Sequence, residues 1–212
     1  MELIFCDEHI VVCIKPSGVL STRDASGKAN MQDLLVKQLN VNDVYPIHRL
    51  DREVSGVMVY ALSSVSAARL SAEVTNHQHF IKEYVAIIEG KPENDEDTLE
   101  DLLFKDSSKN KTFVVKKETR GVKRAKLTYK LIVTDGKDSV VRVRLFTGRT
   151  HQIRVQFASR KLPIVGDRKY GGRANECGIE LYSVRLCFKH PISGETLNFE
   201  YIPESIKEKI YG

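Results

Sequence analysis

Asp51 is the side chain whose neighbours best suit it to chemistry. In the segment 46–56, PIHRLDREVSG, it lies between Arg49 and Arg52, with His48 just upstream. Guanidinium groups nearby favour an ionised carboxylate because they lower the free energy of its charged form. An ionised carboxylate in a setting that attracts phosphates suits a nucleophile or base acting on a polyanion. On charge alone, a solvated cluster of surface ion pairs is the more common explanation, and such clusters add little stability.

Residues 147–158, TGRTHQIRVQFA, form a second candidate site. Thr150 is expected to cap a helix whose apolar side chains recur at i and i+4. Arg149 and Arg154 would then lie near the N-terminus of that helix, where backbone N–H groups and the helix dipole attract anions. The pattern indicates a phosphate-binding position, and by itself it fits phosphate sites of many kinds.

Both segments resemble motifs of one enzyme family. HRLDREVSG is similar to the HRLD-x-x-[ST]-[ST]-G signature of the RluA-type pseudouridine synthases, whose Asp is catalytic. GRTHQIRVQ resembles their motif G-R-[TS]-H-Q-[IL]-R-V-H, in which the Arg matching Arg154 pairs with that Asp. Residues 82–86, KEYVA, resemble their Lys-x-Tyr-x-Ala motif, in which the residue matching Tyr84 packs against the target base. The chain departs from these motifs at Val54 and Gln156, where Thr and His are usual.

The resemblance covers nearly the whole chain and implies an enzyme that isomerises specific uridines to pseudouridine in large-subunit ribosomal RNA or in tRNA. Asp51 would be the catalyst, Arg154 its partner, and Tyr84 the ring that stacks on the flipped base. No cofactor and no metal is implied, because isomerisation includes no redox step. The expected RNA-binding residues are His48, Arg49, Arg52, Lys123, Arg124 and Arg149.

Two other kinds of protein compete with this interpretation. A non-catalytic RNA-binding or ribosome-assembly protein could use the same fold, although Asp51, Tyr84 and Arg154 are all present. A nucleoside hydrolase would usually need a second carboxylate beside Asp51, and the motifs supply none. Three roles stay open for Asp51: attack at the sugar C1′, attack at the base C6, or removal of a sugar proton.

Composition limits the class of protein. The 212 residues, 42% of them hydrophobic, are ample for one core, and a net charge of +5 suits a nucleic-acid partner. The four Cys form no C-x-x-C pair, which argues against a zinc site and indicates reduced thiols in a cytoplasmic protein. His77 and His79 make a poor metal pair. The charged N-terminus predicts neither a signal peptide nor a membrane span, and we expect a monomer.

Hydrophobic periodicity and turn residues predict the elements around these motifs. Asn30 is expected to cap a helix over 31–39 with Leu34, Leu35 and Leu39 on one face, and Ser63 or Ser64 to cap a helix over 64–76. The further predictions are strands over 9–15, 57–62, 80–90, 139–146, 181–188 and 197–201, a turn over 190–195 and a last helix after Pro203.

Two neighbouring segments differ sharply in charge. Residues 93–101 hold six acids and no base, which predicts a solvated loop. Residues 105–130 hold ten Lys or Arg and two acids, and alternate around Gly121. They predict a basic β-hairpin, either with a merely solvated outer face or, as the one-signed charge favours, with phosphate contacts. Residues 162–172, LPIVGDRKYGG, resemble the Ile-x-Gly-Asp-x-x-Tyr-Gly element of the same family, and as a Gly-rich loop they are given a structural role.

The fold that follows is α+β, a pseudouridine synthase fold with a mixed, mainly antiparallel central sheet, flanking helices and a central active-site cleft. The opening DEHIVVCIKPSGV also resembles the start of the family's catalytic domain, in which a Lys-Pro-x-Gly turn follows the first strand. Residues 1–212 are therefore expected to be a single catalytic domain without an upstream S4 domain.

Overall fold

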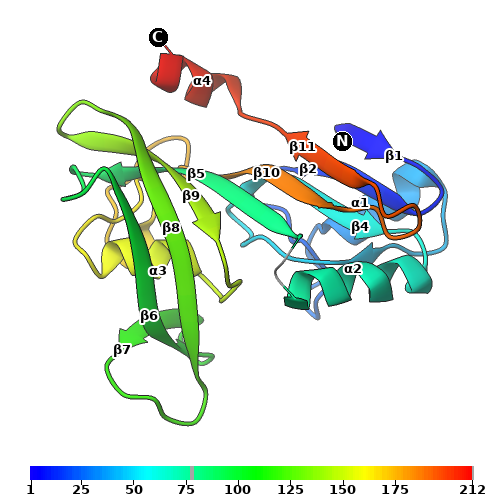
Figure 1. The fold of residues 1–212 in the computed structure, drawn as a ribbon, viewed down its shortest axis with the longest axis horizontal. Coiled ribbons are helices and arrows are strands. Elements are labelled where there is room, and N and C mark those ends of the chain that lie inside the picture. Colours follow the sequence, from blue (N-terminus) through cyan, green and yellow to red (C-terminus); the bar gives the residue numbers. More distant parts are fainter. Residues whose placement is uncertain (77–78, 212) are drawn as a thin grey trace. The chain divides into compact units, whose positions relative to one another are not determined.

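The computed structural model describes residues 1–76 and 79–211 of the chain (Figure 1). His77, half of the pair considered as a metal site, lies outside these residues. The helices are α1 Met31–Leu39, α2 Ser64–Asn76, α3 Gln152–Ala158 and α4 Glu204–Tyr211, with a short 3-10 turn at Arg168–Tyr170. The strands are β1 Leu3–Cys6, β2 Ile10–Lys15, β3 Tyr45–Pro46, β4 Ser55–Ala61, β5 Ile81–Glu89, β6 Glu96–Asp106, β7 Lys111–Val115, β8 Val122–Thr134, β9 Asp138–Leu145, β10 Leu181–Lys189 and β11 Thr196–Glu200.

The chain divides into two compact units. Unit 1 contains Met1–Lys82 and Ser183–Ile202, and unit 2 contains Glu83–Tyr182 and the C-terminal residues from Pro203. Each unit combines antiparallel strand pairs with helices, so the predicted α+β class is confirmed. The expectation of one catalytic domain over residues 1–212 stays a prediction.

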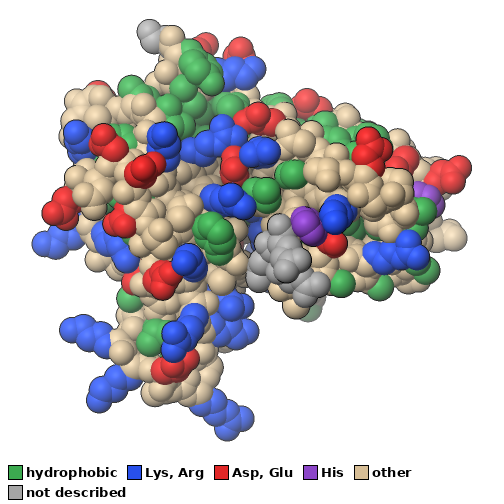
Figure 2. All heavy atoms as spheres, viewed as in Figure 1, with side chains coloured by type: hydrophobic (Ala, Val, Ile, Leu, Met, Phe, Trp, Pro, Cys, Tyr) green, Lys and Arg blue, Asp and Glu red, His purple; other side chains and the backbone are tan. Residues whose placement is uncertain are grey.

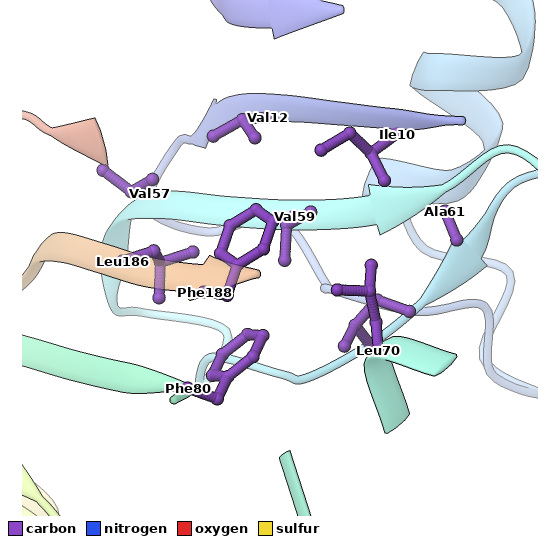
Figure 3. Close-up of a cluster of buried hydrophobic side chains, with 10 residues drawn as sticks. Ile10, Val12, Val57, Val59, Ala61, Leu70, Phe80, Leu186 and Phe188 are labelled. Carbon is purple, nitrogen blue, oxygen red and sulfur yellow. The ribbon is translucent and has the colours of Figure 1, made fainter. Parts of the chain in front are cut away.

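Unit 1 is built on the strand order β1-β2-β4-β10, with β3 beside β4 and β11 beside β10. Alternate residues of β2 and β4 point to one face, where they pack against Leu70 of α2, Phe80 and the side chains of β10 (Figure 3). The rings of Phe80 and Phe188 stack at a centroid distance of 5.5 Å. Burying each such side chain contributes about 2 kcal/mol. This core supports β4, the strand that follows the Asp51 loop.

The predicted helix over 31–39 and its cap are confirmed. The Asn30 side chain accepts a hydrogen bond from the Asp33 backbone N–H at 2.9 Å, which satisfies one of the free donors at the helix start. The prediction that Leu34, Leu35 and Leu39 share one face is wrong, because Leu35 is buried whereas Leu34 is 39% exposed. A helix has about 3.6 residues per turn, so neighbours such as Leu34 and Leu35 point in different directions.

Unit 2 has the strand order β5-β9-β8-β6-β7. The acidic segment 93–101 was predicted to be a loop, which is wrong from Glu96 onward because β6 begins there and pairs with the basic strand β8. Leu99 is buried on one face of β6. On the other face, the Lys126 ammonium lies 2.7 Å from the Glu100 carboxylate. Backbone pairing with β8 and burial of Leu99 therefore keep this acidic segment in the sheet, and the Lys126–Glu100 pair adds a small contribution.

The basic hairpin predicted over 105–130 is wrong in its pairing. Both β7 and β8 pair with β6, which lies between them. The tight turn falls earlier than predicted, where the Asp106 carboxylate accepts the backbone N–H groups of Ser108 and Lys109 and Asn110 adopts a left-handed φ of 46°. Gly121 instead ends the connection from β7 to β8.

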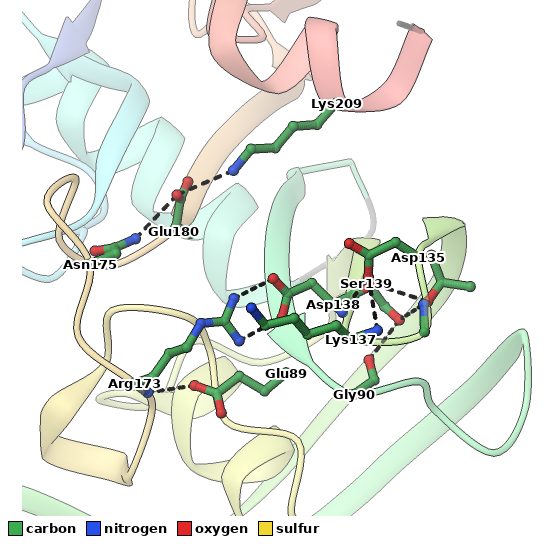
Figure 4. A network of polar contacts seen from close by, with 12 residues as sticks. Glu89, Gly90, Asp135, Lys137, Asp138, Ser139, Arg173, Asn175, Glu180 and Lys209 are labelled. Atoms are coloured by element: carbon green, nitrogen blue, oxygen red, sulfur yellow. Dashed lines mark hydrogen bonds and ion pairs between the residues drawn. The ribbon is translucent and has the colours of Figure 1, made fainter.

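The C-terminal elements agree with their prediction. A turn in which the His190 backbone N–H donates to the Glu195 carbonyl joins β10 to β11, and α4 follows Pro203. A polar network in unit 2 includes α4, because the Lys209 ammonium lies 3.4 Å from the Glu180 carboxylate (Figure 4). In the same network, Arg173 pairs with Asp138.

Candidate functional site

The Asp51 loop of unit 1 is held by its apolar residues and backbone. Leu50 is buried, and both its N–H and its carbonyl bond the Ser21 hydroxyl, at 3.0 and 2.9 Å. The Asp51 carbonyl accepts the Val54 N–H at 3.1 Å, which closes a turn. Val54 is only 2% exposed, so the residue that departs from the family motif serves here as an apolar anchor. Asp51 itself is half-buried between these two anchors.

A fully buried ammonium group supports this loop. Lys15, at the end of β2, donates to the backbone carbonyls of Pro16 at 2.9 Å, Val19 at 2.6 Å and Arg52 at 2.9 Å. Burial lowers the pKa of Lys15 to about 8, although Glu53 and Asp51 partly oppose this shift by their negative charge. Lys15 was not among the predicted site residues. The signal available was a lysine at the end of an apolar strand, directly before a Pro turn.

The basic residues beside Asp51 have different surroundings. Arg49 is exposed, whereas the Arg52 guanidinium donates to the Gly18 carbonyl at 2.9 Å and so ties the loop to the neighbouring turn. His48 turns inward, and its Nε2 accepts the Val59 N–H at 3.3 Å. Burial, helped by the positive charge of Lys82, lowers the pKa of His48 to about 3. A neutral His48 brings no positive charge to a phosphate, so Arg49 is the best placed of these residues for RNA.

Arg154 forms a buried ion pair in unit 2. Its Nε and one terminal nitrogen bond the two carboxylate oxygens of Asp167 at 2.7 and 2.9 Å, and both side chains are almost fully buried. Asp167 lies in the Gly-rich loop that was predicted to be merely structural. A guanidinium carries several N–H donors, so this pair is compatible with a second carboxylate. The proposed pair of Arg154 with Asp51 joins residues of different units and stays a prediction.

Tyr170 links Arg154 to neighbouring elements. Its ring centroid lies 5.2 Å from the Arg154 guanidinium. Its hydroxyl accepts the Thr112 N–H at 2.8 Å and lies 2.9 Å from Nδ1 of His151. Burial raises the pKa of Tyr170, so the hydroxyl keeps its proton. Tyr170 matches the Tyr of the family's Ile-x-Gly-Asp-x-x-Tyr-Gly element, as Asp167 matches its Asp, but sequence reasoning gave neither residue a part in the site.

The helix that carries Arg154 starts differently from the prediction. Thr150 does not cap it; the capping position is His151, with a left-handed φ of 54° and no side-chain cap bond. The Gln152 side chain instead ties the helix to the preceding loop, since its oxygen accepts the Arg149 N–H at 3.0 Å and the Thr147 hydroxyl at 2.7 Å.

The remaining predicted residues lie in unit 2. Tyr84 is buried on β5, and the Arg149 guanidinium donates to the Arg124 carbonyl at 3.0 Å, so it holds β8 in place. The Arg124 side chain pairs with Glu118 at 3.1 Å, whereas Lys123 is exposed. Within residues 1–76 and 79–211, no cluster of three His, Cys, Asp or Glu could hold a metal ion. None of the helices described is long and apolar enough to cross a membrane.

Comparison with known proteins gives consistent matches. A family model described as RNA pseudouridylate synthase matches residues 9–159. The dual-specificity RNA pseudouridine synthase RluA of Yersinia pestis is 31% identical over 205 residues, which cover 94% of this chain and 98% of that protein. The ribosomal large subunit pseudouridine synthase D of Zymomonas mobilis is 30% identical over 222 residues, covering 94% of this chain and 68% of that relative.

Other relatives are longer than this chain. An uncharacterized RNA pseudouridine synthase of Mycoplasma genitalium is 30% identical, and the match covers 94% of this chain but 65% of that protein. The ribosomal large subunit pseudouridine synthase D of Borreliella burgdorferi is covered over 60% of its length. Among solved structures, human RNA pseudouridylate synthase domain containing 4 has a TM-score of 0.80 at 22% identity, covering 96% of this chain and 89% of that one. This likeness shows the fold.

Proposed function

Because the chain belongs to the RNA pseudouridylate synthase family, in its RluA-type branch, we propose that it isomerises uridine to pseudouridine in RNA with Asp51 as the catalyst. One observation carries the proposal most directly. The family match over residues 9–159 includes Asp51, Tyr84 and Arg154 together. Asp51 lies on a loop that is hydrogen-bonded to Lys15, Tyr84 is buried on a strand, and Arg154 forms a buried ion pair.

The reaction balances without a cofactor. The bond from N1 of uracil to C1′ of the sugar breaks, the base turns, and C5 bonds to C1′. A proton leaves C5 and another is gained at N1, so no atom or electron is exchanged with a second substrate. A carboxylate can trap or stabilise positive charge at C1′. Attack at C1′, attack at C6 and removal of a sugar proton all require an ionised Asp51.

Unit 2 supplies the groups that would act on this carboxylate and on the base. Arg154 would pair with Asp51 and keep it ionised, since a neighbouring cation favours the charged form. The buried pair with Asp167 and the ring of Tyr170 hold the Arg154 guanidinium in one orientation. Tyr84 would stack on the extruded uracil, because a base leaves its helix only where a ring or an apolar surface replaces the lost stacking.

We place the target in large-subunit ribosomal RNA or in tRNA. The names of two relatives support this choice, since one is a ribosomal large subunit synthase and the other is a dual-specificity synthase. Mapping pseudouridines in total RNA from cells with and without the gene tests it. The pseudouridines that are absent from cells without the gene identify the substrate RNA and the modified position.

Tritium release from RNA labelled at C5 of uridine tests the activity. Asp51→Asn should stay folded, bind RNA and release no tritium, because an amide cannot act as a nucleophile or base. Glu53→Gln, in the same loop, removes a charge without removing the proposed catalyst and should keep most of the activity. Appreciable release by Asp51→Asn would defeat the assignment of Asp51. If the unaltered chain releases no tritium from any RNA that it binds, a non-catalytic RNA-binding protein becomes the better description.

A further inference from the structure

Cations and aromatic rings alternate from Arg154 to an exposed edge of unit 2. The Tyr170 ring lies 5.2 Å from the Arg154 guanidinium and 5.1 Å from the Lys111 ammonium. The Lys111 ammonium also lies 5.8 Å from the ring of Phe113. A second ammonium, that of Lys109, lies 6.0 Å from the same ring. This row connects the buried candidate site to the edge strand β7.

The row ends at a pair of exposed rings. Phe104 of β6 and Phe113 of β7 are directly paired, so their side chains lie on the same face of the sheet. They are 38% and 37% exposed, which is unusual for adjacent phenylalanines. Gly121 lies beside the Phe104 ring, since a Cβ at Gly121 would be 3.7 Å from it, and its lack of a side chain leaves that ring uncovered. The two rings together form a small exposed apolar patch at the edge of the sheet.

The surroundings of these rings are strongly basic. We call residues 102–124, the ends of β6 and β8 together with β7, the arm of unit 2. Residues 105–124 carry eight Lys or Arg and two acids. Figure 2 shows Lys and Arg side chains projecting from the arm on the face in view. The two acids are already engaged, Asp106 with Lys109 and Glu118 with Arg124. Charge complementarity therefore favours a polyanion as the occupant.

We propose that Phe104 and Phe113 form a stacking site for unpaired bases of the substrate RNA, with Lys109 and Lys111 on the adjoining phosphates. The proposal rests on the proposed function, which makes RNA the ligand, and adds a contact outside the target uridine. Phenyl rings accept any base because every base has a π-face, and lysines follow the backbone without reading sequence. The site would bind single-stranded RNA without distinguishing one base from another. Arg154 lies at the other end of the row of cations and rings.

The chain contains no Trp, which allows a direct test. Phe113→Trp places a single indole in the site, and a base stacked on an indole quenches its emission. Adding a single-stranded uridine-containing oligonucleotide should cause a saturable decrease in emission, reversed by salt. Val65→Trp, at a 56% exposed position on α2, is the matched control and should show no saturable change. The same titration in the Asp51→Asn background should give the same quenching.

A second set of variants separates stacking from apolar contact. Phe104→Leu with Phe113→Leu keeps the site apolar but removes both rings, and should weaken binding of the single-stranded oligonucleotide about tenfold or more. Duplex RNA, whose bases are already stacked, should bind as before. Phe104→Tyr with Phe113→Tyr restores two rings and should restore the affinity. Val65→Ala should change neither affinity.

Each other outcome overturns the stacking site. The stacking site is wrong if RNA binds to the Phe113→Trp variant without quenching its emission, or if RNA quenches the Phe113→Trp and Val65→Trp variants equally. It is also wrong if the double leucine variant binds the single-stranded oligonucleotide as tightly as the unaltered chain. An emission change that follows protein concentration without RNA would assign the rings to contact with a second copy of the chain. Quenching without tritium release by the otherwise unaltered chain defeats the proposed activity alone. Tritium release without quenching defeats the stacking site alone.

Discussion

The ammonium group of Lys15 makes the Asp51 loop sensitive to pH. Three carbonyls accept from it, and only the charged form has an N–H for each of them. Because its pKa is about 8, raising the pH through 8 removes one donor and frees one carbonyl. We expect the single-turnover rate of tritium release to fall above pH about 8, because the loop that carries Asp51 then loses one of its hydrogen bonds. A rate that stays level between pH 7 and 9.5 would contradict this role of Lys15.

The same group has the opposite effect on stability. Its pKa is lowered from 10.5 to about 8 on folding, so the unfolded chain binds more protons than the folded chain between these values. The free energy of unfolding therefore rises with pH across this window, by about 3 kcal/mol at most from this residue. Lys15→Met, a similar length without charge, should lack this rise and show a lower Tm. Denaturant unfolding of both proteins from pH 7.5 to 10 measures the difference, and parallel pH profiles would rule it out.

Asp167 is the residue whose loss should damage unit 2 most. Asp167→Asn removes the negative charge that the almost fully buried Arg154 cation bonds through two oxygens, and breaking a buried pair costs about 3–5 kcal/mol. For a chain of this size, each kcal/mol lowers the Tm by about 2–4 °C. Asp33→Asn removes a carboxylate from a largely exposed pair with Arg23 and should cost less than about 1 kcal/mol. Equal decreases in Tm for the two variants would show that the buried Arg154–Asp167 pair stabilises the fold no more than an exposed pair does.

At the scale of elements, Gly56 fixes how β4 meets β10. It has a left-handed φ of 122°, and a Cβ there would lie 2.1 Å from the Ser183 carbonyl oxygen, inside the backbone of the neighbouring strand. Gly18 has a φ of 83° with no atom within 4 Å of its Cβ position. We expect Gly18→Ala to cost about 1–2 kcal/mol from backbone strain alone. Gly56→Ala should cost several kcal/mol, because the two strands must move apart.

Thermal unfolding of the two variants under the same conditions tests this difference. Gly56→Ala should also lower tritium release at a temperature where it remains folded, since β4 directly follows the Asp51 loop. A Gly56→Ala protein as stable as Gly18→Ala would contradict the close approach of β4 and β10.

Local signals in the sequence were sufficient for some elements and insufficient for others. The Asn30 cap and the β4 strand could be predicted because each depends on residues next to it in the chain. The strand Glu96–Asp106 could not, because its acidic first half is held by pairing with β8, a strand that comes later in the chain. The start of α3 was placed one residue early, because the chain enters the helix through a left-handed His151 without a side-chain cap.

The candidate site divides in the same way. Motif resemblance gave Asp51, Tyr84 and Arg154 a role in the site. It also covered Lys15, Asp167 and Tyr170, but it gave these three no role there. The position of Lys15 before a Pro turn was a local signal, but a lysine is rarely fully buried, and the signal did not show that Lys15 donates to three carbonyls. Asp167 pairs with Arg154 only because the loop after α3 returns to that helix.

At the scale of the whole molecule, the place of the charges should matter more than their sum. The net charge is +5, and the local excess lies in residues 105–130. Lys105 and Lys123 are both exposed on the arm, and Lys28 and Lys37 are equally exposed in unit 1. Changing either pair to Ala lowers the net charge by the same amount. If attraction between RNA and the protein depended on net charge alone, the two double variants would bind RNA equally.

We expect them to differ. Each lost phosphate contact reduces the slope of log affinity against log salt concentration by about 0.7 for single-stranded RNA. Lys105→Ala with Lys123→Ala should therefore weaken RNA binding and flatten this slope by about 1.4, because both contacts are lost. Lys28→Ala with Lys37→Ala should leave the slope unchanged and weaken binding only slightly. Titrations between 50 and 300 mM salt, roughly the range in which counterion release dominates, measure both slopes. Identical slopes for the two variants would remove the arm from the RNA-binding surface.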